Sequence, residues 1–241
     1  MTQQIKLGIL TPSSNTTLEP LTYEIISSIQ GVSAHFSRFT VTEITMDDKA
    51  LSQFDDDHIL QAAELLAHAK VDVIGWSGTS ASWLGFDTDE KLCERIHQRT
   101  GIPATTSVLA LNELIRKNNI KNLGLVTPYL KNVQEKIIAN YAQIGVKVNA
   151  EAHLNLQDNY SFSQVSEEKI KELIDEVGKR KPDAITTLCT NLKGTRLAQL
   201  VEQELDIPLY DSVATVIWKA LKIAGYDTQQ VKGWGRMFQT G

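Results

Sequence analysis

The chain has few residues of the kinds that bind metals or form disulfide bonds. Its 241 residues include two cysteines, Cys93 and Cys189, and five histidines. One disulfide is feasible, but a chain that can bury a core of this size does not need it. The histidines show neither an H-x-x-x-H pair nor any Cys/His ligand spacing, so we expect no metal site. A Walker loop and a G-x-G-x-x-G segment after a strand are also missing, and we expect no cofactor.

Basic runs and a long apolar N-terminal segment are missing as well. Residues 1–10 contain only a few apolar side chains before Thr11 and Pro12, which is too short for a signal peptide or a membrane span. The net charge of −5 and the pI near 5.6 argue against nucleic acid or an anionic membrane as a partner, because both require basic patches. We therefore expect a cytoplasmic protein with neither partner, and leave a homo-oligomer open.

The most informative segment is an apolar run, residues 183–188, that stops in a small polar loop carrying a thiol. Cys189, Thr190 and Asn191 follow the run directly, and residues 196–205 then have apolar side chains at helical spacing. This pattern predicts a buried strand that ends in a ligand-binding loop. A thiol near a helix N-terminus tends to have a lowered pKa. The alternative is an inert cysteine packed in the core.

The same pattern occurs a second time in the chain. Residues 71–80 align without gaps with residues 182–191, which places Gly78 at the position of Cys189, 111 residues earlier. Residues 7–12 match residues 123–128 at an offset of 116, and residues 101–103 match 206–208 at an offset of 105. A repeat of this length is too long for a solenoid unit. It predicts a duplicated α/β lobe.

We therefore predict an α/β fold of two similar doubly wound parallel-sheet lobes related by pseudo-two-fold symmetry. The first lobe is expected to contain residues 1–107 and 213–241, and the second residues 108–212. Two lobes that face each other would bring Gly78 and Cys189 to one cleft from opposite sides, so the site is expected in that cleft.

Three further segments offer hydrogen-bond donors. Ser13, Ser14 and Asn15 lie in a polar turn that could bind a carboxylate, although a helix N-cap favours the same residue types. The loop after the first-lobe strand contains Gly78, Thr79 and Ser80 and could cradle an oxyanion, or simply be a glycine-containing turn. Tyr129 occupies in the second lobe the place of Ser13 in the first. The acidic residues 55–57 are expected to complement the dipole of the helix that follows them.

These features resemble the aspartate/glutamate racemase superfamily, in particular the branch that holds maleate cis-trans isomerase and arylmalonate decarboxylase. The duplicated lobes, the paired loops and the Cys189-Thr190 pair carry the resemblance, which spans essentially the whole chain. Residues 12–17 resemble the N-terminal loop of maleate isomerase, which holds a substrate carboxylate in that family. Residues 78–83, Tyr129 and residues 233–238 resemble arylmalonate decarboxylase. Racemases and maleate isomerase differ from this chain in having a cysteine at the position of Gly78.

The resemblance to arylmalonate decarboxylase implies roles for single residues. Thr79, Ser80 and Tyr129 match the residues that bind the reacting carboxylate there, and Cys189 matches the proton donor. Since loss of CO₂ itself leaves a carbanion, one acid and no base is sufficient for decarboxylation. The resemblance therefore implies a cofactor-independent decarboxylase of malonate-type acids, with Ser14 and Asn15 holding a carboxylate. One alternative is a maleate-type or racemase-family isomerase with Cys189 as nucleophile. Another is a non-catalytic protein that binds small carboxylates.

Overall fold

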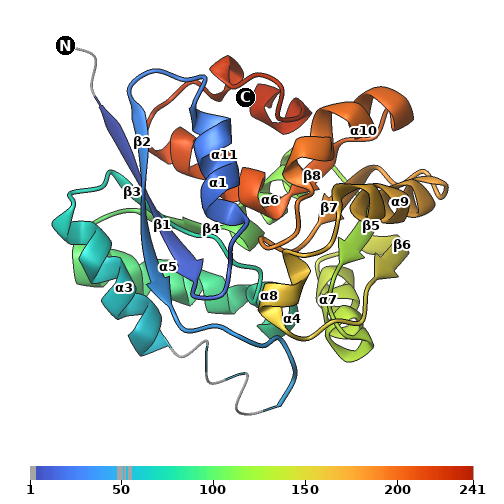
Figure 1. Ribbon diagram of the computed structural model, residues 1–241, viewed down its shortest axis with the longest axis horizontal. Helices are drawn as coiled ribbons and strands as arrows, with labels where there is room; N and C mark the ends of the chain where they lie inside the picture. Colours follow the sequence, from blue (N-terminus) through green and yellow to red (C-terminus); the bar gives the residue numbers. More distant parts are fainter. Residues whose placement is uncertain (1–3, 48–50, 52, 54–55, 241) are drawn as a thin grey trace.

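The computed structural model describes residues 4–47, 51, 53 and 56–240. Two parallel β-sheets, each flanked by helices, lie side by side in this part of the chain (Figure 1). Asp55, which belongs to the predicted acidic run, lies outside the described residues. Among the described residues, no helix has the length and apolar character needed to cross a membrane.

Each sheet has four parallel strands. The first sheet contains β1 (Ile5–Pro12), β2 (Val32–Phe39), β3 (Val73–Trp76) and β4 (Ala104–Thr106) in the order β2-β1-β3-β4. The second contains β5 (Asn122–Thr127), β6 (Lys147–His153), β7 (Ala184–Thr187) and β8 (Leu209–Asp211) in the order β6-β5-β7-β8. The predicted fold class, two parallel-sheet α/β lobes, is confirmed.

Helices connect the strands, as parallel pairing requires. Those that follow strands of the first sheet are α1 (Leu18–Ile26), α3 (Asp56–His68), α4 (Ala81–Leu84), α5 (Phe86–Thr100) and α6 (Ser107–Lys117). Those that follow strands of the second sheet are α7 (Lys131–Gln143), α8 (Asn159–Phe162), α9 (Glu167–Gly178), α10 (Ala198–Leu205) and α11 (Ser212–Ile223). Short 3₁₀ helices begin at Thr195, Thr228 and Arg236.

The strand registers follow the offsets of the sequence repeat. Leu7 pairs with Val73 in the first sheet, and the residues 116 and 111 positions later, Leu123 and Ala184, pair in the second. Likewise Ile74 pairs with Ala104, and Ile185 pairs with Leu209. The duplication therefore extends to hydrogen-bond register, and the loops after β3 and β7 occupy equivalent places.

The two lobes are joined by α6 and α11, which pack against each other, while α11 also contacts β3 and β4 of the first sheet. α11 also contacts β8 of the second sheet. The C-terminal tail contacts the second lobe. Arg236 donates hydrogen bonds to the Glu202 carbonyl and the Asp206 carboxylate at the end of α10. The predicted lobe boundaries near residues 107 and 213 stay a prediction.

Candidate functional site

A small cavity lies where the loops after β3 and β7 meet. Its volume is about 20 Å³, room for about one water molecule. The described residues that line it come from both lobes: Pro12, Val41, Ile44, Trp76, Gly78, Thr79, Ser80, Trp83, Tyr129, Asn159, Cys189 and Thr190. A larger hollow of about 660 Å³ lies beside α5 and α6, and the described residues that line it include none of the predicted site residues. The small cavity is therefore the candidate site because of the residues that line it, and not because of its volume.

Cys189 is buried in the loop that follows β7, with 2% of its surface exposed. The next helical segment begins at Thr195, as the spacing of residues 196–205 predicts, but the lowered thiol pKa expected from that helix is wrong. The Asn191 backbone N–H donates to Cys189 Sγ at 3.4 Å. Burial raises the pKa of the thiol to about 12, although the donors Asn191 and Tyr129 oppose this effect. The thiol is therefore protonated at neutral pH.

Tyr129 and Thr79 form a hydroxyl pair at the cavity. Tyr129 OH lies 2.7 Å from Thr79 Oγ1, and both side chains are at most 5% exposed. Burial raises the pKa of Tyr129 well above its usual value, with a further contribution from the neighbouring Cys189. Tyr129 is therefore a neutral phenol that can donate a hydrogen bond. Ser80 adds a third hydroxyl to the same wall.

Gly78 and Cys189 line this cavity from equivalent loops. Both were expected at one cleft, and the cavity brings them together. Thr190 also lines it, with Oγ1 donating to the Ser77 carbonyl at 3.2 Å. Asn191 lies outside the lining. Its Nδ2 donates to the Asn159 carbonyl at 2.6 Å, and its Oδ1 accepts from the Thr16 backbone N–H.

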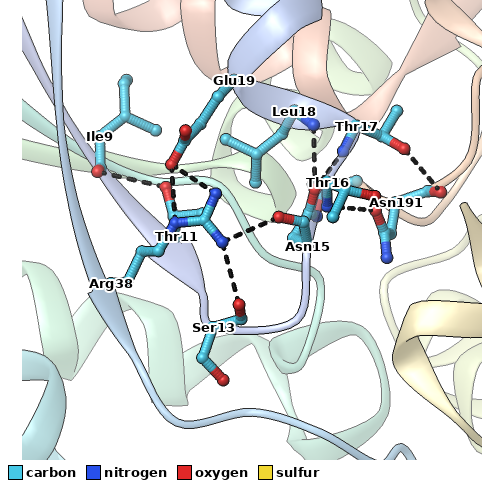
Figure 2. Close-up of polar contacts among 11 residues, drawn as sticks. Ile9, Thr11, Ser13, Asn15, Thr16, Thr17, Leu18, Glu19, Arg38 and Asn191 are labelled. Atoms are coloured by element: carbon cyan, nitrogen blue, oxygen red, sulfur yellow. Dashed lines mark hydrogen bonds and ion pairs between the residues drawn. The ribbon is translucent and has the colours of Figure 1, made fainter.

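The serines of the N-terminal polar turn do not line the cavity. Ser13 is exposed, and its Oγ accepts a hydrogen bond from the Val41 backbone N–H at 3.2 Å. Ser14 Oγ donates to the Val41 carbonyl at 2.6 Å and accepts from Asn159 Nδ2 at 2.8 Å. Arg38 braces the turn from outside by donating to the carbonyls of Ser13 and Asn15 (Figure 2).

Asn15 satisfies backbone N–H groups at the start of α1 from two residues before the N-cap Thr17, which makes no side-chain cap bond of its own. Its Oδ1 accepts from the backbone N–H groups of Thr17 and Leu18, both at 2.9 Å (Figure 2). This is the capping alternative for the polar turn. Its Nδ2 donates to Thr190 Oγ1 at 3.1 Å, so Asn15 links the start of α1 to a residue of the cavity. A direct role of the turn in carboxylate binding stays a prediction.

Six lining residues were not among the predicted site residues: Pro12, Val41, Ile44, Trp76, Trp83 and Asn159. Pro12 directly precedes the polar turn and the two tryptophans flank the Gly78 loop, so closeness in sequence was a usable signal for these three. The other three reach the site through tertiary contacts. Segment 42–44 pairs with segment 157–159, since the Ile44 N–H donates to the Gln157 carbonyl and the Asn159 N–H to the Thr42 carbonyl. No local pattern encodes that pairing.

The lining combines neutral donors with an apolar wall. None of the described lining residues carries a charge, and Val41, Ile44, Trp76 and Trp83 form the apolar part. Such a site can hold a carboxylate or an enediolate through hydroxyl donors while keeping water away from the thiol. Within the described residues, no group of three or more His, Cys, Asp or Glu side chains is arranged to hold a metal ion.

The chain matches a known protein family over most of its length. The family model described as arylmalonate decarboxylase matches residues 27–238. The chain belongs to the arylmalonate decarboxylase family. The expected relationship to this branch is confirmed, and so is the expectation of an enzyme, an isomerase or a lyase.

The chain is similar both to maleate isomerases and to arylmalonate decarboxylase. Maleate isomerase of Geobacillus stearothermophilus is 24% identical over 92% of each chain. Arylmalonate decarboxylase of Bordetella bronchiseptica is 24% identical over 76% of this chain and 77% of its own. A solved maleate cis-trans isomerase of Nocardia farcinica, which holds a covalently bound succinylcysteine intermediate, has a TM-score of 0.89 at 20% identity and covers 98% of this chain and 99% of its own. The comparisons support the two activities equally.

Proposed function

We propose that this family member is a cofactor-independent decarboxylase of a malonate-type acid. One observation carries the proposal: the cavity contains a single thiol, that of Cys189, which burial keeps protonated, while the equivalent position in the first lobe is Gly78. A lone protonated thiol suits the delivery of one proton to one face of a carbanion.

The proposed reaction has two steps. Thr79, Ser80 and Tyr129 donate hydrogen bonds to the carboxylate that stays on the substrate. The other carboxylate lies against the apolar wall and leaves as CO₂; the electron pair of the broken C–C bond becomes an enediolate held by the same donors. Cys189 then gives its proton to the carbon and becomes a thiolate. A proton from solvent restores the thiol.

The surroundings of Cys189 support the transient thiolate. The Asn191 and Leu192 backbone N–H groups and the Tyr129 hydroxyl all lower the pKa of the thiol, against the larger effect of burial. Because these donors already face the sulfur, they stabilise its negative charge without rearrangement. The proposed carboxylate-binding roles of Ser13, Ser14 and Asn15 would require them to exchange their present bonds to Val41 and Thr190.

The second candidate is isomerisation of a maleate-like acid. It is favoured by the similarity over 92% of the chain to a maleate isomerase. In this reaction the Cys189 thiolate would add to one alkene carbon, the new single bond would rotate, and elimination would return the thiolate and the trans acid. The nucleophile must first lose its proton, and the raised pKa of Cys189 weighs against that step.

A substrate panel tests the proposal. CO₂ release from substituted malonates and conversion of maleate to fumarate would be measured on the same enzyme, together with thermal shifts for each acid, which register even weak binders. Malonate decarboxylation supports the proposal, and maleate conversion alone supports the second candidate. Binding of an acid without turnover would support a non-catalytic carboxylate-binding protein. The cytoplasmic location and the possibility of a homo-oligomer stay predictions.

A further inference from the structure

Trp76 is the largest side chain that is fully buried at the cavity. It ends β3, is 1% exposed and lines the cavity directly. Its indole packs on Phe39, with ring centroids 4.9 Å apart and the planes tilted by 47°. Phe39 is itself buried, so the indole is held against the cavity from behind. A close-packed aromatic pair of this kind resists displacement.

The Trp76 ring occupies the space that a side chain at position 78 would need. A Cβ atom built on Gly78 would lie 2.0 Å from Cζ2, 2.2 Å from Cε2 and 2.6 Å from Cη2 of Trp76. Gly78 does not have a left-handed backbone conformation, so the requirement for glycine comes from the ring and not from the backbone angle. Trp76 therefore takes the place that a second thiol would have.

The Trp76 indole also carries a donor that is not used. Its Nε1 is buried and has no hydrogen-bond partner among the described residues. Cε2, the carbon bonded to Nε1, lies on the ring edge that faces Gly78. A buried N–H without an acceptor is unfavourable, so an acceptor supplied by a bound ligand would stabilise it. The nearest acceptors that a substrate would supply are its carboxylate oxygens.

We propose that Trp76 is a specificity-determining residue of this site: its ring excludes large substituents from the Gly78 side, and its N–H donates to an oxygen of the bound acid. The inference rests on the proposed function and narrows it. It assigns malonates with small alkyl substituents as substrates, in preference to those with aryl substituents.

The first test compares methylmalonate with phenylmalonate, measured as kcat/KM for CO₂ release. Trp76→Ala is expected to raise the ratio of phenylmalonate to methylmalonate by about tenfold or more, the scale of size discrimination in apolar pockets. Trp76→Phe keeps most of the wall and removes the donor, so it is expected to raise KM for methylmalonate about two- to tenfold with a smaller change in the ratio. Trp76→Leu replaces the alanine variant if that variant does not fold.

Trp218 supplies the matched control. It is also fully buried with an unpartnered Nε1, but it lies in α11 and is not among the lining residues. Trp218→Phe is expected to change neither the ratio nor KM beyond twofold, a change of about 0.4 kcal/mol. An unchanged ratio in both Trp76→Ala and Trp76→Leu would overturn the inference.

The second test is independent of turnover. If the wild-type enzyme decarboxylates neither acid, the proposed function fails, and thermal unfolding then decides separately whether the Trp76 ring fills the Gly78 side of the cavity. Gly78→Cys is expected to lower Tm by about 3–10 °C in the wild-type background, because the new Cβ overpacks against the Trp76 ring. In the Trp76→Ala background the loss should be less than half as large. Equal losses in both backgrounds would show that the ring does not occupy this space, and the inference would fall.

Discussion

The loops after β3 and β7 occupy equivalent positions in the two lobes but differ in where they carry a large side chain. In the first lobe a large residue, Trp76, precedes Gly78 by two positions. In the second lobe the equivalent pair is Thr187 and Cys189. β3 ends at Trp76 and β7 at Thr187, so Gly78 and Cys189 both lie in loops. The Trp76 ring occupies the space that a Cβ at Gly78 would need, whereas the second lobe has the smaller Thr187 two residues before its thiol.

The difference extends to the buried acids behind the loops. In the second lobe, Asp211 at the end of β8 accepts hydrogen bonds from Thr187 and Thr195. In the first lobe the equivalent position is Thr106, which donates to Asp89 of α5. In each lobe, therefore, a buried carboxyl group is hydrogen-bonded to threonine. The negative charge of Asp211 contributes to the raised pKa of Cys189, and Asp89 does not. The two lobes therefore share their strand registers but differ in the side chains that they place at the site.

Removal of the second-lobe thiol should have the largest effect. Cys189→Ala is expected to lower kcat/KM about 10²–10⁴-fold, the usual contribution of a positioned proton donor. Steady-state kinetics on the acid found by the substrate panel would measure it. Cys93→Ala is the matched control, because Cys93 lies in α5 and its pKa is likewise raised to about 12 by burial. Equal activity of the two variants would mean that Cys189 is structural.

Introducing the second-lobe residue pair into the first lobe should make protonation of the carbanion less selective for one face. Trp76→Thr with Gly78→Cys reproduces the Thr187 and Cys189 arrangement and supplies a thiol on the opposite face. The substrate here is a malonate with two different alkyl substituents on C2, because only then is the decarboxylation product chiral. Since a proton reaches carbon only from a group within hydrogen-bond distance on that face, the product should change from one enantiomer toward a mixture. Chiral chromatography of the product measures this. Gly78→Cys alone serves as the control, and we expect it to be overpacked rather than two-sided. Retention of a single enantiomer in the double variant would contradict the prediction.

The two buried acids predict how stability depends on pH. Burial raises the pKa of Asp89 to about 7 and that of Asp211 to about 6. Because the folded protein holds these protons more tightly than the unfolded chain, the stabilisation is complete below about pH 4. Above that pH it falls by about 1.4 kcal/mol per pH unit for each carboxyl that is protonated only in the folded protein, and it is lost as the pH rises through 6 and 7. Urea unfolding at pH 5 and pH 8 should therefore show higher stability at pH 5.

Single substitutions separate the lobes in this experiment. Asp89→Asn should flatten the profile from about pH 4 to pH 7, and Asp211→Asn from about pH 4 to pH 6. Asp183 is a control of opposite sign, because backbone N–H donors at Asn122 and Lys121 lower its pKa. Its stabilising contribution is lost only as the pH falls below its ordinary range, so Asp183→Asn should leave the slope above pH 5 unchanged. An identical profile for Asp89→Asn and the wild type would show that Asp89 titrates normally.

Much of the fold was predictable from sequence because repetition is a sequence property. The offsets of 116, 111 and 105 residues reproduce the strand registers, and they bring Gly78 and Cys189 to one cavity. The raised pKa of Cys189 was not predictable, because its main cause is the burial of the thiol in the folded protein. Val41, Ile44 and Asn159 were missed for a related reason, since only tertiary pairing of segments 42–44 and 157–159 brings them to the site.

The smallest expected effect concerns the polar turn that precedes α1. Asn15→Ala should lower the free energy of unfolding by about 1 kcal/mol, because Oδ1 caps the backbone N–H groups of Thr17 and Leu18. Ser13→Ala is the control, since Ser13 is exposed and its loss should cost less than about 0.5 kcal/mol. Both values would come from urea unfolding at constant pH.

Diacid binding by the same two variants separates capping from a direct role in the site. If Asn15 only caps α1 and positions Thr190 through its 3.1 Å hydrogen bond, its loss should change stability more than affinity. If instead it exchanges that bond for a substrate carboxylate, Asn15→Ala should weaken diacid binding by about 1–3 kcal/mol, the cost of an unmet buried polar partner. Isothermal titration of the folded variant measures that affinity. A stability loss with unchanged affinity would therefore leave carboxylate binding to the hydroxyls of Thr79, Ser80 and Tyr129 alone.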